Sequence, residues 1–247
     1  MSAGSASPFF FLDDLLNILI IDAGTEDRTR LANLLAPARC FCIEQAVSTS
    51  EAREKIRSGK RFHCIITELG MDDVDDDEFY IPRNYAHHCS VMILTASTSP
   101  VKGATCAWLG ARAVFEKGDR FDERKFFLAL TDMLTINIVN LRYSQNTNDT
   151  LNMATRTLLE TAPQTVTEWA DKMRITDRQL RNLWHTESGF GAKHILFLFH
   201  CFKRAFAYYE TILFTPSHNK KEAERHFSQR HYSYFTTHRE LLTFILS

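Results

Sequence analysis

The chain has 247 residues, of which 45% are hydrophobic, and a formal net charge of −1. A chain of this length can form two domains of ordinary size, each with its own core. No stretch approaches the roughly 18 uninterrupted apolar residues of a transmembrane helix, so we expect a soluble protein with no membrane partner. The charge is unevenly divided, because residues 1–139 carry a net −5 and residues 140–247 a net +4. The basic half is the better candidate for binding a polyanion such as DNA.

The six cysteines lack the CxxC pairs and histidine partners that are typical of zinc sites. We therefore expect buried thiols in a reducing cytoplasm, and no metal or cofactor. Residues 1–16 contain an aromatic run (PFFFL), but no basic residue precedes it and two aspartates follow it, which is unlike a secretory signal. We interpret residues 1–16 as a disordered tail.

From residue 17 onward, short apolar runs alternate with amphipathic stretches. Strands are expected at 17–22, 41–47, 63–67, 91–94 and 113–115, and helices at 28–35, 51–58, 103–109 and about 122–134. Ser48 and Glu51 form a capping box at the start of the second helix. Because the strands are apolar throughout, both faces of the sheet should be buried under helices. The pattern predicts a five-stranded, parallel, doubly wound (flavodoxin-like) α/β domain over residues 17–136.

Four polar residues lie where the carboxyl ends of these strands are expected, which is where ligands gather in such a sheet. Asp22 ends the first strand, Glu68 the third and Thr95 the fourth, and the fifth leads to Lys117. This arrangement resembles the active site of response-regulator receiver domains, and the resemblance covers about residues 17–136. In that family an aspartate after the third strand accepts a phosphoryl group, and two adjacent acids after the first strand hold magnesium.

The resemblance is incomplete at the positions that serve phosphoryl transfer. Glu68 stands at the acceptor position, Ala23 at the second magnesium acid, Gly118 at the usual proline and Val114 at an aromatic switch residue. Thr95 and Lys117 match the family. We therefore predict a pseudo-receiver that is not regulated by aspartyl phosphorylation.

Two interpretations of Glu68 stay open. Glutamate is one methylene longer than aspartate, so its carboxylate can reach Lys117 and partly imitate a phosphorylated aspartate. Alternatively, Asp22, Glu68 and Lys117 form an inherited salt-bridge cluster with no switching role. A third hypothesis is that Glu68 or another residue still accepts phosphate weakly. It predicts that a small phosphodonor with magnesium adds a phosphate to the intact chain, and we expect no such addition.

The second half begins after a polar linker at residues 137–150, and residues 151–247 are expected to form an all-α domain. Two capping boxes, Thr165 with Glu168 and Thr176 with Gln179, open two short helices, and Gly189 ends the second. Two capped helices joined by a short turn are the pattern of a helix-turn-helix.

In a helix-turn-helix the second helix enters the major groove of DNA. Its apolar residues define an inner face, so that Arg178, Arg181 and Asn182 lie on the outer face, where they suit guanine and adenine edges. Thr176, at the N-terminus of this helix, is placed for a phosphate contact.

A long helix at about 192–213 follows, and the segment 165–205 resembles the first helix-turn-helix and connecting helix of AraC-type regulators. That family carries a second helix-turn-helix, but here residues 220–227 (KKEAERHF) place charges at its apolar positions. Arg230 is the DNA-contact candidate of this degraded part. A monomer whose second helix-turn-helix is weakened needs a second subunit to bind DNA with useful affinity, so we expect a homodimer.

These features predict a cytoplasmic DNA-binding transcription regulator, whose pseudo-receiver serves dimerisation or partner binding. The alternative is a protein-interaction adaptor of a signalling pathway with a vestigial helix-turn-helix, in which the acidic domain docks a signalling protein. We expect no enzyme, because no nucleophile, base and oxyanion site come together and no Walker or GxGxxG loop is present.

Overall fold

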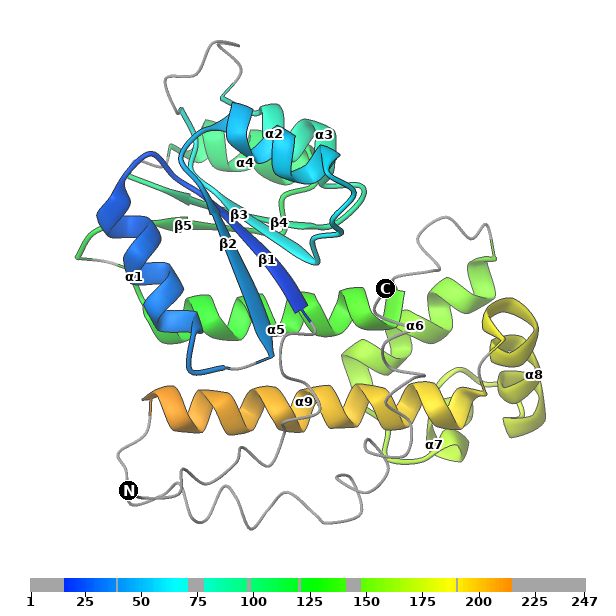
Figure 1. The fold of residues 1–247 in the computed structure, drawn as a ribbon. Coiled ribbons are helices and arrows are strands. Elements are labelled where there is room, and N and C mark those ends of the chain that lie inside the picture. The colour runs from blue at the N-terminus through cyan, green and yellow to red at the C-terminus, as the bar shows by residue number, and fades with distance from the viewer. Residues whose placement is uncertain are drawn as a thin grey trace. The chain divides into compact units, whose positions relative to one another are not determined.

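The computed structural model describes residues 16–38, 40–70, 78–96, 99–119, 121–140, 148–189 and 191–214 (Figure 1). The described residues divide into two compact units, one within 16–134 together with 208–214 and the other within 135–207. None of the helices in these described ranges is long and apolar enough to cross a membrane.

The first unit contains a five-stranded parallel sheet in the order β2-β1-β3-β4-β5. Its strands are β1 (Leu16–Ile21), β2 (Phe41–Ala46), β3 (Cys64–Thr67), β4 (Ser90–Thr95) and β5 (Ala113–Glu116). Ile18 of β1 pairs with Ile43 of β2 on one side and with Cys64 of β3 on the other. This is the strand order of flavodoxin-like folds, so the predicted fold class of the N-terminal part is confirmed.

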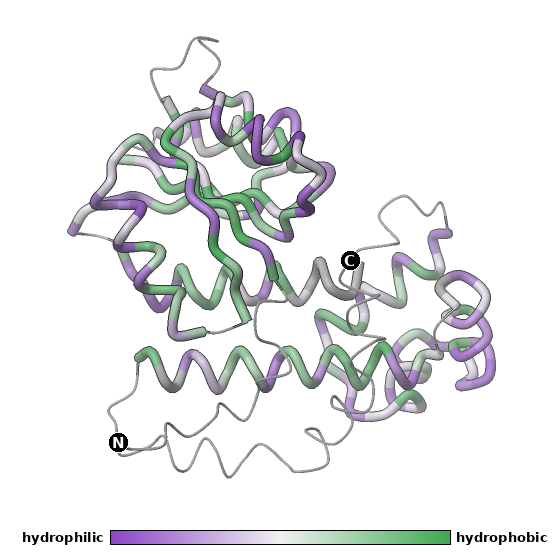
Figure 2. The backbone as a smooth tube through the Cα atoms, viewed as in Figure 1, coloured by the Kyte–Doolittle hydropathy of each residue, from purple (hydrophilic) through white to green (hydrophobic). Residues whose placement is uncertain are grey.

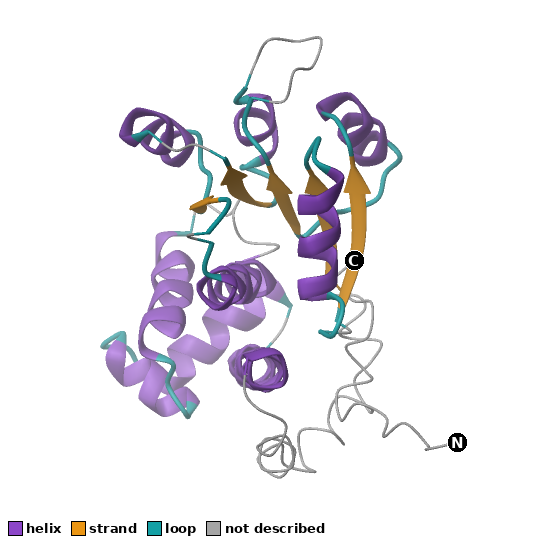
Figure 3. Ribbon diagram, turned by 90° about the vertical axis from the view of Figure 1, so that its left-hand side faces the viewer, coloured by secondary structure: helices purple, strands orange, loops and turns teal. Residues whose placement is uncertain are grey.

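Helices cover both faces of the sheet (Figures 1 and 3). They are α1 (Thr25–Leu35), α2 (Thr49–Arg57), α3 (Tyr80–Tyr85), α4 (Pro100–Trp108) and α5 (Glu123–Asn140). Side chains of neighbouring strand residues alternate between the faces, so Leu19 and Ile21 enter one core layer and Ile18 and Ile20 the other. All four are fully buried, and the central strands are the most hydrophobic part of this unit (Figure 2).

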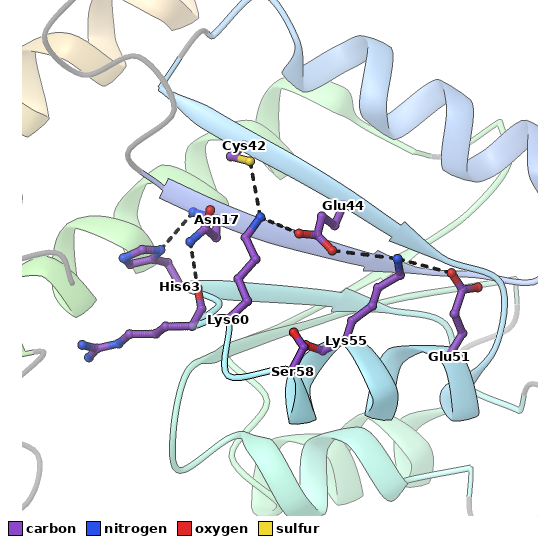
Figure 4. Close-up of polar contacts among 9 residues, drawn as sticks. Asn17, Cys42, Glu44, Glu51, Lys55, Ser58, Lys60 and His63 are labelled. Atoms are coloured by element: carbon purple, nitrogen blue, oxygen red, sulfur yellow. Dashed lines mark hydrogen bonds and ion pairs between the residues drawn. The ribbon is translucent and has the colours of Figure 1, made fainter.

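Glu44 of the edge strand β2 takes part in a network of charges with residues of α2 and of the segment that follows it (Figure 4). Glu44 pairs with Lys60 and lies 3.9 Å from Lys55, which lies 3.4 Å from Glu51 of α2. Lys60 Nζ also lies 3.6 Å from Cys42 Sγ. Charged side chains on an edge strand discourage pairing with another sheet, so this network protects the edge.

Most element boundaries differ from the sequence prediction by one to three residues. Two of the differences extend into segments that were expected to be a tail or a linker. β1 begins at Leu16, and α5 continues to Asn140, into the segment expected to be a linker. No glycine or proline follows Leu134 to end the helix, so helical structure continues along the chain.

The second unit is built from helices: α6 (Asp149–Thr161), α7 (Val166–Lys172), α8 (Asp177–Ser188) and most of α9 (Ala192–Phe214). Its core centres on two fully buried tryptophans, Trp169 and Trp184, whose ring centroids are 5.5 Å apart. Trp169 Nε1 donates a hydrogen bond to the carbonyl oxygen of Ala154 on α6 (3.0 Å), which satisfies the buried N–H. The predicted all-α organisation is confirmed for the described residues of this half.

The predicted helix caps are also confirmed. The side chains of Ser48, Thr165 and Thr176 accept hydrogen bonds at the starts of α2, α7 and α8, and Gly189 ends α8 with a φ of 73°. All six cysteines are free thiols, and burial raises the pKa of Cys89 to about 12. A thiol in such surroundings stays protonated and unreactive.

Candidate functional site

The carboxyl ends of β1, β3 and β5 bring Asp22, Glu68 and Lys117 together, as predicted. Lys117 Nζ lies 2.6 Å from the Asp22 carboxylate and 2.9 Å from the Glu68 carboxylate. A third acid, Asp27 in the first turn of α1, also lies 2.9 Å from this ammonium. The Asp22 and Lys117 side chains are only 3% and 10% exposed. One buried ammonium therefore forms ion pairs with three carboxylates. We call these four residues, Asp22, Asp27, Glu68 and Lys117, the Lys117 cluster.

Thr95 is the buried last residue of β4. Its carbonyl oxygen accepts a hydrogen bond from the backbone N–H of Lys117 (2.8 Å), because β4 and β5 are parallel neighbours. This backbone hydrogen bond to Thr95 fixes the position of Lys117, whose ammonium lies in the cluster.

A second cation, Arg28 of α1, contacts the loop after β1. The guanidinium of the buried Arg28 donates hydrogen bonds to the carbonyl oxygens of Asp22 and Ala23 and to Thr25 Oγ1 (3.1 Å). Gly24 N donates to Asp22 Oδ1 (2.8 Å). These contacts satisfy the polar groups of the loop from within the chain.

The charges of the cluster influence one another. Burial raises the pKa of Glu68, and the nearby Asp22 adds to this effect, while Lys117 opposes it. Burial lowers the pKa of Lys117, but its hydrogen bonds to Asp22, Asp27 and Glu68 outweigh this and raise it overall. Lys117 is therefore a permanent cation, and Glu68 binds a proton more readily than an ordinary glutamate.

Sequence reasoning missed Asp27 and Arg28. Both lie on α1, and their contacts depend on the direction in which that helix leaves β1. The available signal was an acid and an arginine within the first turn of the helix that follows Asp22. Within the described part of the chain, no group of three or more His, Cys, Asp and Glu side chains could hold a metal ion.

A second candidate site lies on the outer face of α8. Leu180 and Trp184 are fully buried on the inner face, whereas Arg178, Arg181 and Asn182 are exposed, as the helical spacing predicted. His185 is exposed as well and lies one turn beyond Arg181 and Asn182. It was not selected from the sequence, although its spacing of seven residues from Arg178 places it on the same face. We call Arg178, Arg181, Asn182 and His185 the α8 surface.

Thr176 is occupied by the helix cap. Its hydroxyl accepts from Gln179 N (3.2 Å) and donates to Gln179 Oε1 (2.9 Å), which in turn accepts from Thr176 N (2.8 Å). The hydroxyl and the backbone N–H thus have partners inside the chain, and a phosphate contact through either group would compete with the cap. Arg230, the remaining predicted DNA contact, lies outside the described residues.

The first unit has a CheY-like receiver fold, defined by its strand order and by the cluster position at the carboxyl ends of the strands. It is joined to a helical unit that contains a capped helix pair, α7 and α8.

Comparison with solved structures finds receiver domains that match the N-terminal half of the chain. The chemotaxis protein CheY4 of Vibrio cholerae is 21% identical and covers 48% of this chain and 98% of its own, with a TM-score of 0.42. A two-component response regulator from Clostridium difficile is 18% identical over 48% and 95% of the two chains, with a TM-score of 0.43. A structure of the P1 domain of CheA3 in complex with CheY6 from R. sphaeroides matches at 20% identity over 48% and 96%, with a TM-score of 0.41. These are similarities of fold alone. No protein-family model matches the sequence, and a search of curated proteins found no match.

Proposed function

We propose that this protein is a cytoplasmic, DNA-binding transcription regulator of the response-regulator type, in which α8 enters the major groove. The observation that carries the proposal is the pair α7 and α8. Helices of 7 and 12 residues, each with a side-chain N-cap, are joined by a short turn and present the α8 surface outward. Arginine and asparagine are the side chains that pair with guanine and adenine edges, and the buried tryptophans hold the helix in one orientation.

Two further features support DNA binding. The segment 165–205 resembles AraC-type regulators, and residues 140–247 carry a net charge of +4. One reading helix with this modest charge binds weakly by itself, so we propose a homodimer on double-stranded DNA.

The receiver-like unit is not proposed to act as a phosphorylation-dependent switch. In the family it resembles, magnesium binds between carboxylates, but here Lys117 already pairs with Asp22, Asp27 and Glu68. Ala23 supplies no carboxylate, and Glu68 stands at the acceptor position. We propose that this pseudo-receiver serves dimerisation or contact with another signalling protein, and that the chain has no catalytic activity.

A gel shift with the full-length chain tests the DNA-binding role. The probes are promoter fragments from the source genome, and the variants are Arg181→Ala and a matched control, Arg156→Ala. Arg156 is an exposed arginine of α6 with an i,i+4 ion pair to Glu160, as Arg181 has to Asp177. We expect Arg181→Ala to weaken binding by about ten-fold or more and Arg156→Ala to leave it unchanged, because a base contact contributes this much. Equal effects of the two variants would contradict a reading role for α8.

A second candidate function, a protein-interaction adaptor with a vestigial helix-turn-helix, is favoured by one observation. Trp108 is 84% exposed and Val101 is 74% exposed, both on α4. Large apolar side chains exposed near one another are typical of protein-binding surfaces. If none of the promoter fragments binds, the result would favour the adaptor function over the DNA-binding function.

A further inference from the structure

An acidic residue stands at the start of the otherwise basic outer face of α8. Asp177 is the first residue of the helix, and its carboxylate accepts hydrogen bonds from Nε and Nη2 of Arg181, one turn later (Nη2–Oδ2 3.2 Å). A negative charge is favourable at a helix N-terminus. Beside a DNA-reading helix, however, it also repels phosphate. The helix dipole accounts for an acid here but does not require Arg181 to bind it through two nitrogens.

A third residue, on the neighbouring helix, holds the acid in place. Thr167 Oγ1 of α7 donates a hydrogen bond to Asp177 Oδ2 (3.1 Å). Thr167, Asp177 and Arg181 therefore form a chain of hydrogen bonds that spans both helices of the pair. An arginine that is held in advance loses less conformational freedom on binding than one that moves freely.

The geometry leaves the tip of the guanidinium available. The hydrogen bonds to Asp177 use the edge formed by Nε and Nη2, so the end formed by Nη1 and Nη2 can meet a ligand. The Arg181 side chain is half exposed. Guanine presents two acceptors, O6 and N7, that accept two parallel N–H groups from one arginine in the major groove.

We infer that Asp177 and Thr167 are positioning residues that determine specificity, because together they aim Arg181 at one guanine in the major groove. This role rests on the proposed function of the α8 surface. It has a consequence that a purely structural role lacks. Loss of the Asp177 charge lowers the preference for guanine while it strengthens binding to DNA of any sequence, since one repulsion from phosphate disappears.

Selection from a randomised duplex pool, followed by sequencing of the retained DNA, tests this with the full-length chain. Arg181→Ala identifies the base pair that this arginine reads. At that pair we expect Asp177→Asn to lower the guanine preference by about ten-fold, since a bidentate arginine–guanine contact contributes discrimination of this order. Thr167→Val should lower it in the same direction but less. Asp171→Asn is the matched control, because it removes an exposed acid from α7 without touching Arg181.

Affinity for a duplex of unrelated sequence is measured in parallel, and circular dichroism establishes that each variant is folded. Asp177→Asn should bind the unrelated duplex more tightly than wild type. A folded Asp177→Asn protein with an unchanged guanine preference overturns the inference and leaves the proposed function standing. An equal loss of preference in Asp171→Asn also overturns it, because the effect would then be one of net charge. If the wild-type protein enriches no sequence, the proposed function fails, and this role fails with it.

Discussion

Replacement of Lys117 by methionine tests how much the Lys117 cluster contributes to the stability of the receiver-like unit. Methionine retains most of the side-chain volume but removes the ammonium, so Asp22, which is 3% exposed, loses its counter-ion. Breaking a buried ion pair by removing one partner costs about 3–5 kcal/mol. Glu68 and Asp27 are 18% and 40% exposed, so water compensates for part of their loss. We expect a decrease of about 2–4 kcal/mol in the free energy of unfolding of this unit.

The assay is urea unfolding at pH 7, followed by far-UV circular dichroism. Lys125→Met is the matched control, because Lys125 is 78% exposed and pairs with Asp122 at the surface. An exposed pair of this kind contributes little, so the control should unfold like the wild type. In a thermal scan, the Lys117 variant should melt about 8 to 16 °C lower, since 1 kcal/mol corresponds to about 4 °C in a domain of this size.

The pH dependence separates the loss of charge from a packing defect. Without Lys117, burial still raises the pKa of Glu68 and no cation opposes this effect, so the folded state binds this proton more tightly than the unfolded state and gains stability as the pH falls. The difference between variant and wild type should therefore shrink between pH 7 and pH 5. In the wild type, Lys117 has a raised pKa, so its contribution is complete below the usual value of 10.5 and is lost only as the pH rises through the higher folded value. A variant as stable as the wild type at pH 7, or a deficit that does not change with pH, would refute this reasoning.

Three further predictions concern the Lys117 cluster and the N-cap of α8. Treatment with acetyl phosphate and Mg²⁺ should leave the intact mass of the chain unchanged, and an added phosphoryl group would contradict the assignment of a pseudo-receiver. Glu68→Gln should raise the unfolding free energy at pH 8, because burial raises the pKa of this carboxylate and the charged form therefore costs stability. This gain should disappear as the pH falls through the folded pKa of Glu68 towards the usual value of 4.5, and a loss of stability at pH 8 would be the opposite result. Thr176→Ala should destabilise the second unit by about 1 kcal/mol through loss of the α8 cap, as measured by urea unfolding, whereas an unchanged midpoint would mean that Gln179 alone sustains the cap.

Much of the receiver-like site could be predicted from the sequence, for a simple reason. Parallel strands end at the same edge of the sheet, so the residues that follow apolar runs converge whatever the intervening loops do. Asp22, Glu68 and Lys117 were placed together on this basis, and their side chains do meet. Capping residues are equally local signals, which is why Ser48 and Thr176 were placed correctly.

Contacts that depend on the path of a helix could not be predicted in this way. Asp27 meets Lys117 in the loop after β5 because α1 packs beside the carboxyl end of the sheet, and Arg28 binds the carbonyl oxygens of Asp22 and Ala23 because the first turn of α1 lies over the loop after β1. The ion pair between Asp177 and Arg181 has the i,i+4 spacing of a surface pair, which the sequence does contain. Its hydrogen bond from Thr167 on α7, however, depends on how two helices pack.

The salt dependence of DNA affinity tests the central claim most directly. Fluorescence anisotropy of a labelled duplex, selected by the wild-type protein, is measured from low to physiological salt for the wild type and for Arg181→Ala. If the α8 surface reads DNA, the logarithm of the affinity should fall linearly with the logarithm of salt concentration, with a slope of about −0.9 for each phosphate contacted. Arg181→Ala should then bind the selected duplex about ten-fold or more weakly with nearly the same slope, because it removes a base contact. Affinity that is insensitive both to salt and to Arg181 would contradict the assignment of this protein as a DNA-binding regulator.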